Sequence, residues 1–387
     1  MTTTEVIGRT AEERREIVAL AREFAQREIA PHAAEWDRQK TYPREIIARL
    51  GELGFLGMRV PERYDGLGLD PLTYVMVIEE IAAADGSVAI TIGVHNSLVS
   101  TMLLEHGTEA QKERWLKPLA RGERLGAFAM SEADSGSDAA GLRAEARREG
   151  EGWVLRGTKG WVTNGDTADL LVVMARTDTP ERRLGSRGIS AFIVPAATPG
   201  VEPGKAEDKM GLRASRTTSV VLNDVRLPLD HLLGQEHRGL HHALGALDRG
   251  RIGVAAQAVG IARAALEAAV AYAAERRQFE RPIKDFQAVQ FKLADMATRV
   301  AAARALLHEV ARALERGELR SADASMAKLF AAEAAMWVTT QAVQVFGGYG
   351  YMRDYPVERL FRDAKVTEIY EGTSEVQRIV IARALYA

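Results

Sequence analysis

The sequence predicts an α+β protein in which a β domain lies between two helical domains. Apolar residues recur with helical spacing in roughly the first 120 residues and again from about residue 240, whereas short apolar runs bounded by turn residues fill the middle third. We expect an N-terminal helical domain over residues 1–122, a β-barrel-like domain over 123–235 and a C-terminal four-helix bundle over 236–387.

The helical regions follow from apolar periodicity. Residues 11–29 carry apolar side chains at the i, i+3, i+4 and i+7 positions, and Ala30-Pro31 is expected to end that helix. Further N-terminal helices are expected over 43–53, 71–84 and 96–106. Long Ala- and Leu-rich stretches predict the antiparallel bundle, with helices over 251–275, 287–315, 322–346 and 374–386.

The middle third shows the pattern of strands. Short apolar runs separated by Gly, Pro and an Asn-Gly pair are typical of β structure. The expected strands include residues 153–155, 170–174, 189–194 and 219–222.

Composition excludes several classes of function. The 51 Lys and Arg against 53 Asp and Glu give a net charge of -2, so no overall field attracts nucleic acid. The absence of cysteine excludes disulfides, thiolate catalysis and iron–sulfur clusters, so any redox chemistry belongs to a bound organic cofactor. The charged N-terminus and the lack of an apolar run of about 18 residues predict a cytoplasmic protein without membrane insertion.

Three patterns imitate known sites but fail on context. The glycine-rich residues 347–352 follow a helical pattern instead of a strand, which excludes a Rossmann loop. Thr158-Lys159 reverses the order that a phosphate-binding loop needs. His241 and His242 are adjacent, which makes shared metal ligation awkward, so we expect exposed helix residues and no metal site.

Two segments at the start of the β region suit a planar ligand. Gly136 and Ser137 allow backbone N–H groups to approach closely, and Ser131 offers a hydroxyl to a heterocycle edge. Trp161 can present a flat face, with the Thr163 hydroxyl on the same side of a strand. An ordinary turn and a core Trp in a hairpin remain alternatives for the two segments.

A third segment near the C-terminus presents a carboxylate. Glu371 precedes Gly372, which ends local secondary structure and leaves the carboxylate unobstructed. Thr373 is a good N-cap for the final helix, with Glu375 in its first turn. A helix start explains the last two residues but accounts less well for the Glu-Gly pair.

These segments resemble the acyl-CoA dehydrogenase family over essentially the whole chain. AMSEADSGSDAAG at 129–141 and QVFGGYGYMRDYPVERLFRD at 344–363 resemble the two family signatures, and IYEGTSEVQR at 369–378 resembles the catalytic loop. Where the family usually has Pro-Gly, this chain has Ala133-Asp134, so the loop backbone is expected to differ slightly.

The resemblance implies FAD between the β domain and the bundle, with part of each site from a neighbouring subunit of a homotetramer, a dimer of dimers. The residues implied to contact FAD are Phe128, Met130, Ser131, Gly136, Ser137, Trp161, Thr163, Arg276, Phe279, Gln287, Gln344, Gly347, Gly348, Thr373 and Glu375. For Arg276, a solvated charge at a helix end is the alternative.

The resemblance also implies Glu371 as the catalytic base. Some relatives carry the base at the position of Gly250, which has no carboxylate here. The implied acyl-CoA contacts are Ser137, Asp248, Arg251, Tyr370 and Gly372, although Asp248 and Arg251 could also form a surface ion pair.

The implied reaction is α,β-dehydrogenation of an acyl-CoA to the trans-2-enoyl-CoA, with FAD accepting the β-hydride and an electron-transferring flavoprotein taking the electrons. The segments DKMGLRAS, LDRGRIGVAAQA and TEIYEGTSEVQR resemble the short-chain and short-branched-chain members most. An oxidase that reduces oxygen and a non-catalytic binding protein with the same fold are the alternatives.

Overall fold

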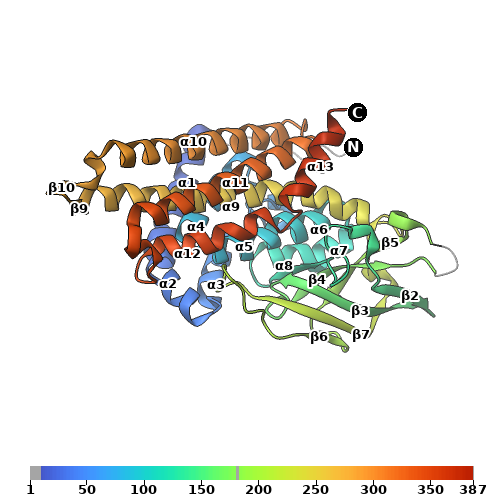
Figure 1. Cartoon of the computed structure of the whole chain (residues 1–387). Coiled ribbons are helices and arrows are strands. Elements are labelled where there is room, and N and C mark those ends of the chain that lie inside the picture. The colour runs from blue at the N-terminus through green and yellow to red at the C-terminus, as the bar shows by residue number, and fades with distance from the viewer. Residues whose placement is uncertain (1–9, 180–182, 387) are drawn as a thin grey trace.

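The computed structural model describes residues 10–179 and 183–386, and it confirms the predicted fold class. In Figure 1 the sheet lies at one end of the molecule, the long C-terminal helices run along one side, and the N-terminal helices pack between them. The N-terminal helices are α1 (Ala11–Phe24), α2 (Ala30–Gln39), α3 (Arg44–Glu52), α4 (Pro71–Ala84), α5 (Gly86–Val94), α6 (Thr101–His106), α7 (Glu109–Gln111) and α8 (Lys117–Ala120).

The first helix does not end at Ala30-Pro31, so that prediction is wrong. A π-helical turn at Ala25–Ile29 joins α1 to α2, and Pro31 lies in the first turn of α2. Proline lacks the N–H that an α-helix uses, and the π-helical turn just before it lets the chain continue without that hydrogen bond.

The middle region forms one open sheet in the described residues, not a closed barrel. Its order is β6-β7-β3-β2-β4-β5-β8, and β1 pairs in parallel with β4. The strands are β1 (Gly126–Ala129), β2 (Glu145–Glu149), β3 (Gly152–Thr163), β4 (Leu170–Arg176), β5 (Ile189–Pro195), β6 (Val201–Pro203), β7 (Thr217–Pro228) and β8 (Leu232–Leu233). The sheet buries β4 completely, and α9 and the N-terminal helices pack beside it.

The C-terminal helices are α9 (Gly239–Glu275), α10 (Gln287–Glu315), α11 (Ser321–Phe346), α12 (Pro356–Lys365) and α13 (Ser374–Ala384). A two-stranded hairpin of β9 (Arg277–Gln278) and β10 (Arg281–Pro282) joins α9 to α10. The helix α12 was not expected, and α4 packs against both α9 and α10, so the N-terminal region contributes to the bundle.

Two helical stretches have the length and composition of membrane spans but lie largely inside the protein. The helical stretch Gly86–His106 and α9 are long and apolar enough to cross a membrane, but most of their residues are buried within the protein.

His241 is exposed as expected, whereas His242 is buried and stacks on His106 with ring centroids 3.8 Å apart. The expectation of two exposed histidines is therefore wrong for His242.

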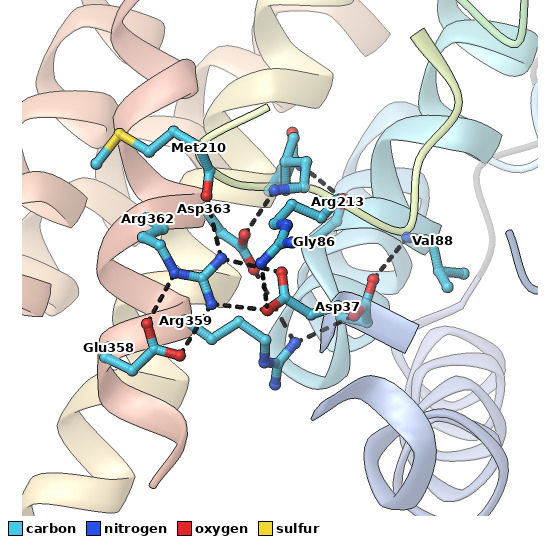
Figure 2. Close-up of polar contacts among 12 residues, drawn as sticks. Asp37, Gly86, Val88, Met210, Arg213, Glu358, Arg359, Arg362 and Asp363 are labelled. Carbon is cyan, nitrogen blue, oxygen red and sulfur yellow. Dashed lines mark hydrogen bonds and ion pairs between the residues drawn. The ribbon is translucent and has the colours of Figure 1, made fainter. Parts of the chain in front are cut away.

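Ion pairs and a hydrogen bond, all at least half-buried, fasten α12 to the rest of the molecule (Figure 2). The contacts are Arg362 with Asp37 at 2.7 Å, Arg359 with Asp85 at 3.1 Å, and the Leu212 N–H donating to Asp363 at 2.6 Å. One short helix thus holds α2, the start of α5 and the DKMGLRAS segment together, directly before the chain enters the segment that carries Glu371.

Candidate active site

The segment around Glu371 has an unusual backbone. Glu371 has φ 51° and Gly372 φ 94°, both in the left-handed region that side chains other than glycine rarely adopt. Thr373 then caps α13 by accepting a hydrogen bond from the Val376 N–H at 3.3 Å, as predicted. Among the described residues no acceptor takes the Glu371 N–H, which leaves a free donor beside the carboxylate.

Two side chains hold this backbone. Lys328 on α11 donates from Nζ to the Gly372 carbonyl at 2.8 Å. Gln377 on α13 donates from Nε2 to the same carbonyl at 2.7 Å and to the Glu371 carbonyl at 3.2 Å. These contacts offset the cost of the left-handed conformation, which is about 1–3 kcal/mol for a non-glycine residue.

The Glu371 carboxylate lies directly over Gly250 of α9. A Cβ atom at Gly250 would overlap Glu371 Oε2 and would lie 2.9 Å from Leu98 Cδ2. Within the described structure Oε2 is buried and has no hydrogen-bond partner. Burial raises the pKa of Glu371 to about 7, while the positive charges of Lys328 and Arg251 act in the opposite direction. A carboxylate of this kind can exchange a proton near neutral pH.

Polar groups also line the neighbouring face of α9. The Tyr370 hydroxyl contacts Gln257 Oε1, and Gln257 Nε2 donates to the Gly86 carbonyl at 2.8 Å, so the segment that carries Glu371 is tied to α9 and α5. The Tyr74 hydroxyl is buried without a partner in the described residues, 3.3 Å from where a Cβ of Gly253 would lie. The two glycines, one helical turn apart, thus let Glu371 and Tyr74 approach the α9 backbone closely.

Asp248 and Arg251 form an i,i+3 ion pair at 2.5 Å, as in the alternative to a CoA contact, but Arg251 is buried. The guanidinium therefore does not belong to a surface pair. It lies near enough to Glu371 to favour the ionised carboxylate.

On the sheet side, the structure brings several predicted residues together. Phe128 is buried on β1, Met130 and Ser131 follow it, and the Ser131 carbonyl accepts the Gly160 N–H at 2.9 Å. The Trp161 side chain is 60% exposed, which contradicts the alternative of a core Trp. Trp161 has φ 53° at a register shift of β3, and it flanks buried Val162 together with Thr163. The exposed indole and the partly exposed Thr163 side chain thus both remain accessible at this end of β3.

The loop that follows β1 is held by a buried carboxylate. Glu132 accepts the backbone N–H groups of Arg143 at 2.7 Å and Ala144 at 2.9 Å, and it pairs with buried Lys159 at 2.7 Å. Exposed Gly136 and Ser137 lie in this loop, and nothing lies within 4 Å of where a Gly136 Cβ would be. The loop therefore has a fixed base and an accessible tip.

Thr373 and Glu375 lie at the start of α13 beside Glu371, whereas the remaining predicted cofactor residues lie at the far end of the bundle. Arg276 ends α9 with its guanidinium 5.2 Å from the Tyr349 ring centroid, and Phe279 is 86% exposed in the β9–β10 turn. Gln287, Gln344, Gly347 and Gly348 are exposed at the adjoining ends of α10 and α11. Figure 1 shows β9 and β10 at the end of the molecule opposite the sheet, so one chain does not bring the two sets together.

Sequence reasoning missed Lys328, Gln377, Gln257 and Tyr74. Lys328 is a lone cation among buried alanines of α11, and that pattern is its only signal in the sequence. The other three are buried polar residues, Tyr74 on α4, Gln257 on α9 and Gln377 on α13, that no local pattern sets apart from neighbouring residues. No group of three or more His, Asp or Glu side chains in the described ranges is arranged to hold a metal ion.

Comparisons with known proteins agree with this geometry. Sequence models of the acyl-CoA dehydrogenase N-terminal, middle and C-terminal domains match residues 11–123, 127–225 and 237–386. The chain is 47% identical to the short-chain specific acyl-CoA dehydrogenase of Bos taurus mitochondria over 361 residues, covering 93% of this chain and 87% of that protein.

Two solved structures share the fold closely. Butyryl-CoA dehydrogenase from Megasphaera elsdenii has a TM-score of 0.94 and 43% identity, with 100% of both chains covered. A chain from a structural study of the electron transferring flavoprotein of Acidaminococcus fermentans has a TM-score of 0.95 and 46% identity, covering 100% of this chain and 99% of that one.

Proposed function

The chain belongs to the acyl-CoA dehydrogenase family, whose members are FAD-dependent oxidoreductases, and on that premise we propose that it oxidises a short-chain acyl-CoA to the trans-2-enoyl-CoA with Glu371 as the base. The observation that carries this proposal is the buried, unpartnered carboxylate oxygen of Glu371 over Gly250.

Glu371 can remove a proton only if the site helps it. The α-proton of an acyl thioester is too weakly acidic for a free carboxylate, and burial raises the pKa of Glu371 to about 7, which makes it a stronger base. The free Glu371 N–H can donate to the thioester oxygen and so stabilise the developing enolate. Glu371 would thus provide both the proton acceptor, through its carboxylate, and a hydrogen-bond donor to the enolate oxygen, through its backbone N–H.

The residues on the sheet suit a flavin. Trp161 offers an exposed flat face, Thr163 a hydroxyl two residues further along β3, and Gly136 a backbone with no described atom within 4 Å of its Cβ position. These groups would hold the flavin ring, whereas Arg276 and Gln344 would hold the adenine and pyrophosphate end of FAD bound to another subunit. Bound FAD supplies the acceptor for the hydride from the substrate β-carbon.

For CoA we propose contacts from Ser137, Asp248, Arg251, Tyr370 and Gly372. The short-chain preference rests on the short-chain and butyryl-CoA relatives. The likeness to a chain studied with an electron transferring flavoprotein supports such a protein as the electron acceptor. The homotetramer and the cytoplasmic location stay predictions.

An anaerobic visible spectrum tests the proposal. The purified protein is expected to show oxidised flavin that bleaches when butyryl-CoA is added, and to bleach less with longer or branched acyl-CoAs. Bleaching only with another acyl-CoA would refute the short-chain substrate. A protein that binds no flavin after reconstitution with FAD would refute the enzyme, and rapid peroxide formation in air would favour an oxidase.

A further inference from the structure

Lys328 is a buried cation to which the proposed reaction assigns no role. Its side chain is fully buried on α11, surrounded along that helix by buried alanines. Removing an ammonium group from water costs several kcal/mol unless other groups compensate. A lysine in such a place therefore needs a reason specific to its surroundings.

Within residues 10–179 and 183–386, the ammonium group donates to one acceptor, the Gly372 carbonyl at 2.8 Å. The same carbonyl also accepts from Gln377 at 2.7 Å. Lys328 approaches from α11 and Gln377 from α13, so two helices fix the peptide that follows Glu371. With this peptide fixed, the left-handed φ of Glu371 and Gly372 turns the carboxylate back over α9.

The charge of Lys328 acts on Glu371 as well. Burial lowers the pKa of Lys328 to about 8, while the carboxylates of Glu371, Glu368 and Glu375 favour its charged form and Arg251 opposes it. Lys328 thus stays mainly protonated at neutral pH. Its positive charge opposes the effect of burial on the pKa of Glu371.

We propose that Lys328 is a positioning residue for the proposed dehydrogenation: by holding the Gly372 carbonyl and facing Glu371 with a positive charge, it keeps the base over Gly250 and ionised. Gln377 contributes only to the first of these roles because it is neutral. The inference rests on the proposed function of Glu371.

Two substitutions separate the two roles. Lys328→Gln keeps a donor for the Gly372 carbonyl but removes the charge, and Lys328→Met removes both while nearly filling the space. Lys209→Met is the matched control, because Lys209 is half-buried and donates to a backbone carbonyl, that of Ser215 at 2.7 Å, in a segment away from Glu371. Flavin content and Tm are measured for each variant to verify folding.

The decisive readout is the rate of flavin bleaching by butyryl-CoA from pH 5.5 to 9 in anaerobic rapid mixing. We expect Lys328→Gln to move the acidic limb of the profile to higher pH, by roughly half a unit or more, because a lost positive charge favours protonated Glu371. Lys328→Met is expected to show the same shift and also a maximal rate lower by about 100-fold, the scale that a misplaced catalytic group can cost. Lys209→Met is expected to keep the wild-type profile.

If both Lys328 variants bind flavin and keep the wild-type limb and maximal rate, the lysine is merely structural and the inference is wrong. If Lys328→Met alone fails to fold, the profile of Lys328→Gln still decides. Wild-type protein that does not bleach would instead refute the proposed function, so the two failures are distinguishable.

Discussion

Glu371 and Gly250 depend on each other at the scale of single residues. Glycine inside a helix costs about 1 kcal/mol relative to alanine, and Gly250 lies well within α9. The overlap of any Cβ there with the Glu371 carboxylate explains why the helix carries this cost. We infer that the missing side chain makes room for the base.

Gly250→Ala is therefore expected to displace the carboxylate and lower the rate of substrate-dependent flavin reduction by about 100-fold. Gly245→Ala is the matched control, because Gly245 lies on the same helix with nothing within 4 Å of its Cβ position. That variant should keep its activity and gain up to about 1 kcal/mol of stability. Equal activity of the two variants would contradict the placement of Glu371.

The pH dependence of flavin bleaching is expected to follow the ionisation of the Glu371 carboxylate. As the proposed base, Glu371 would remove a proton only when ionised, and its pKa is raised to about 7. The bleaching rate is therefore expected to fall about tenfold per unit as the pH drops below 7 and to level off above it. A limb near pH 4.5 in the enzyme–substrate complex would show that burial does not raise the pKa of the base.

The sequence allowed Glu371 to be singled out, because Gly372 and Thr373 mark a break and a helix start. The expectation of an unobstructed carboxylate was incomplete, since one oxygen is enclosed above α9. Lys328 could not be found in this way because its contact joins residues 44 positions apart in the chain. Such a contact arises from the packing of α11 beside α13 and leaves no local pattern.

At the scale of elements, α12 is the clearest omission. Pro356 at its first turn and buried Val357, Leu360 and Ala364 at i, i+3 and i+7 are helix signals, but the helix is short. Its charged side chains read as surface residues in the sequence, whereas the fold buries Arg359 and Asp363. For the sheet, apolar runs predict the strands, but they do not predict whether the sheet closes into a barrel.

Asp363 makes the packing of α12 against the rest of the protein sensitive to pH. Burial raises its pKa to about 7, with Arg359 opposing the shift and Asp85 adding to it. Between the ordinary value of 3.8 and about 7, the folded protein binds a proton that the unfolded chain has released. The stability contributed by Asp363 therefore falls as the pH rises through this window.

Asp363→Asn removes that dependence while leaving an oxygen to accept the Leu212 N–H. The Tm of the variant relative to the wild type is expected to increase by roughly 2 °C between pH 5 and pH 8. Calorimetry of both proteins over this range measures the difference. A difference that stays constant or decreases would contradict a buried, protonated Asp363.

At the scale of the whole molecule, the sheet, which carries Trp161 and Thr163, lies at the opposite end from β9 and β10, where Arg276 and Phe279 are found (Figure 1). Both groups of residues were predicted for one FAD site because the resemblance does not state which subunit contributes which residue. Trp161 at one end and Phe279 at the other are both exposed large side chains. An assembly that brings the end of one bundle to the sheet of another chain would cover both.

We expect a native mass that is a multiple of 42.3 kDa. Arg276→Ala is expected to lower FAD affinity about tenfold or more, because an arginine that binds phosphate contributes a charge-assisted hydrogen bond. Arg15→Ala, at an exposed position of α1, is the control. Mass photometry and FAD titration of the apoprotein measure both effects, and a monomer with full FAD affinity would contradict a shared site.

The proposed removal of the substrate proton by the buried carboxylate of Glu371 is tested by Glu371→Gln. Gln has nearly the same shape but is not a base. In anaerobic rapid mixing with butyryl-CoA, we predict that the variant keeps its oxidised flavin spectrum, shows the perturbation of that spectrum caused by acyl-CoA binding, and bleaches slower than the wild type by several orders of magnitude. Bleaching at a near-normal rate would contradict the assignment of Glu371 as the base.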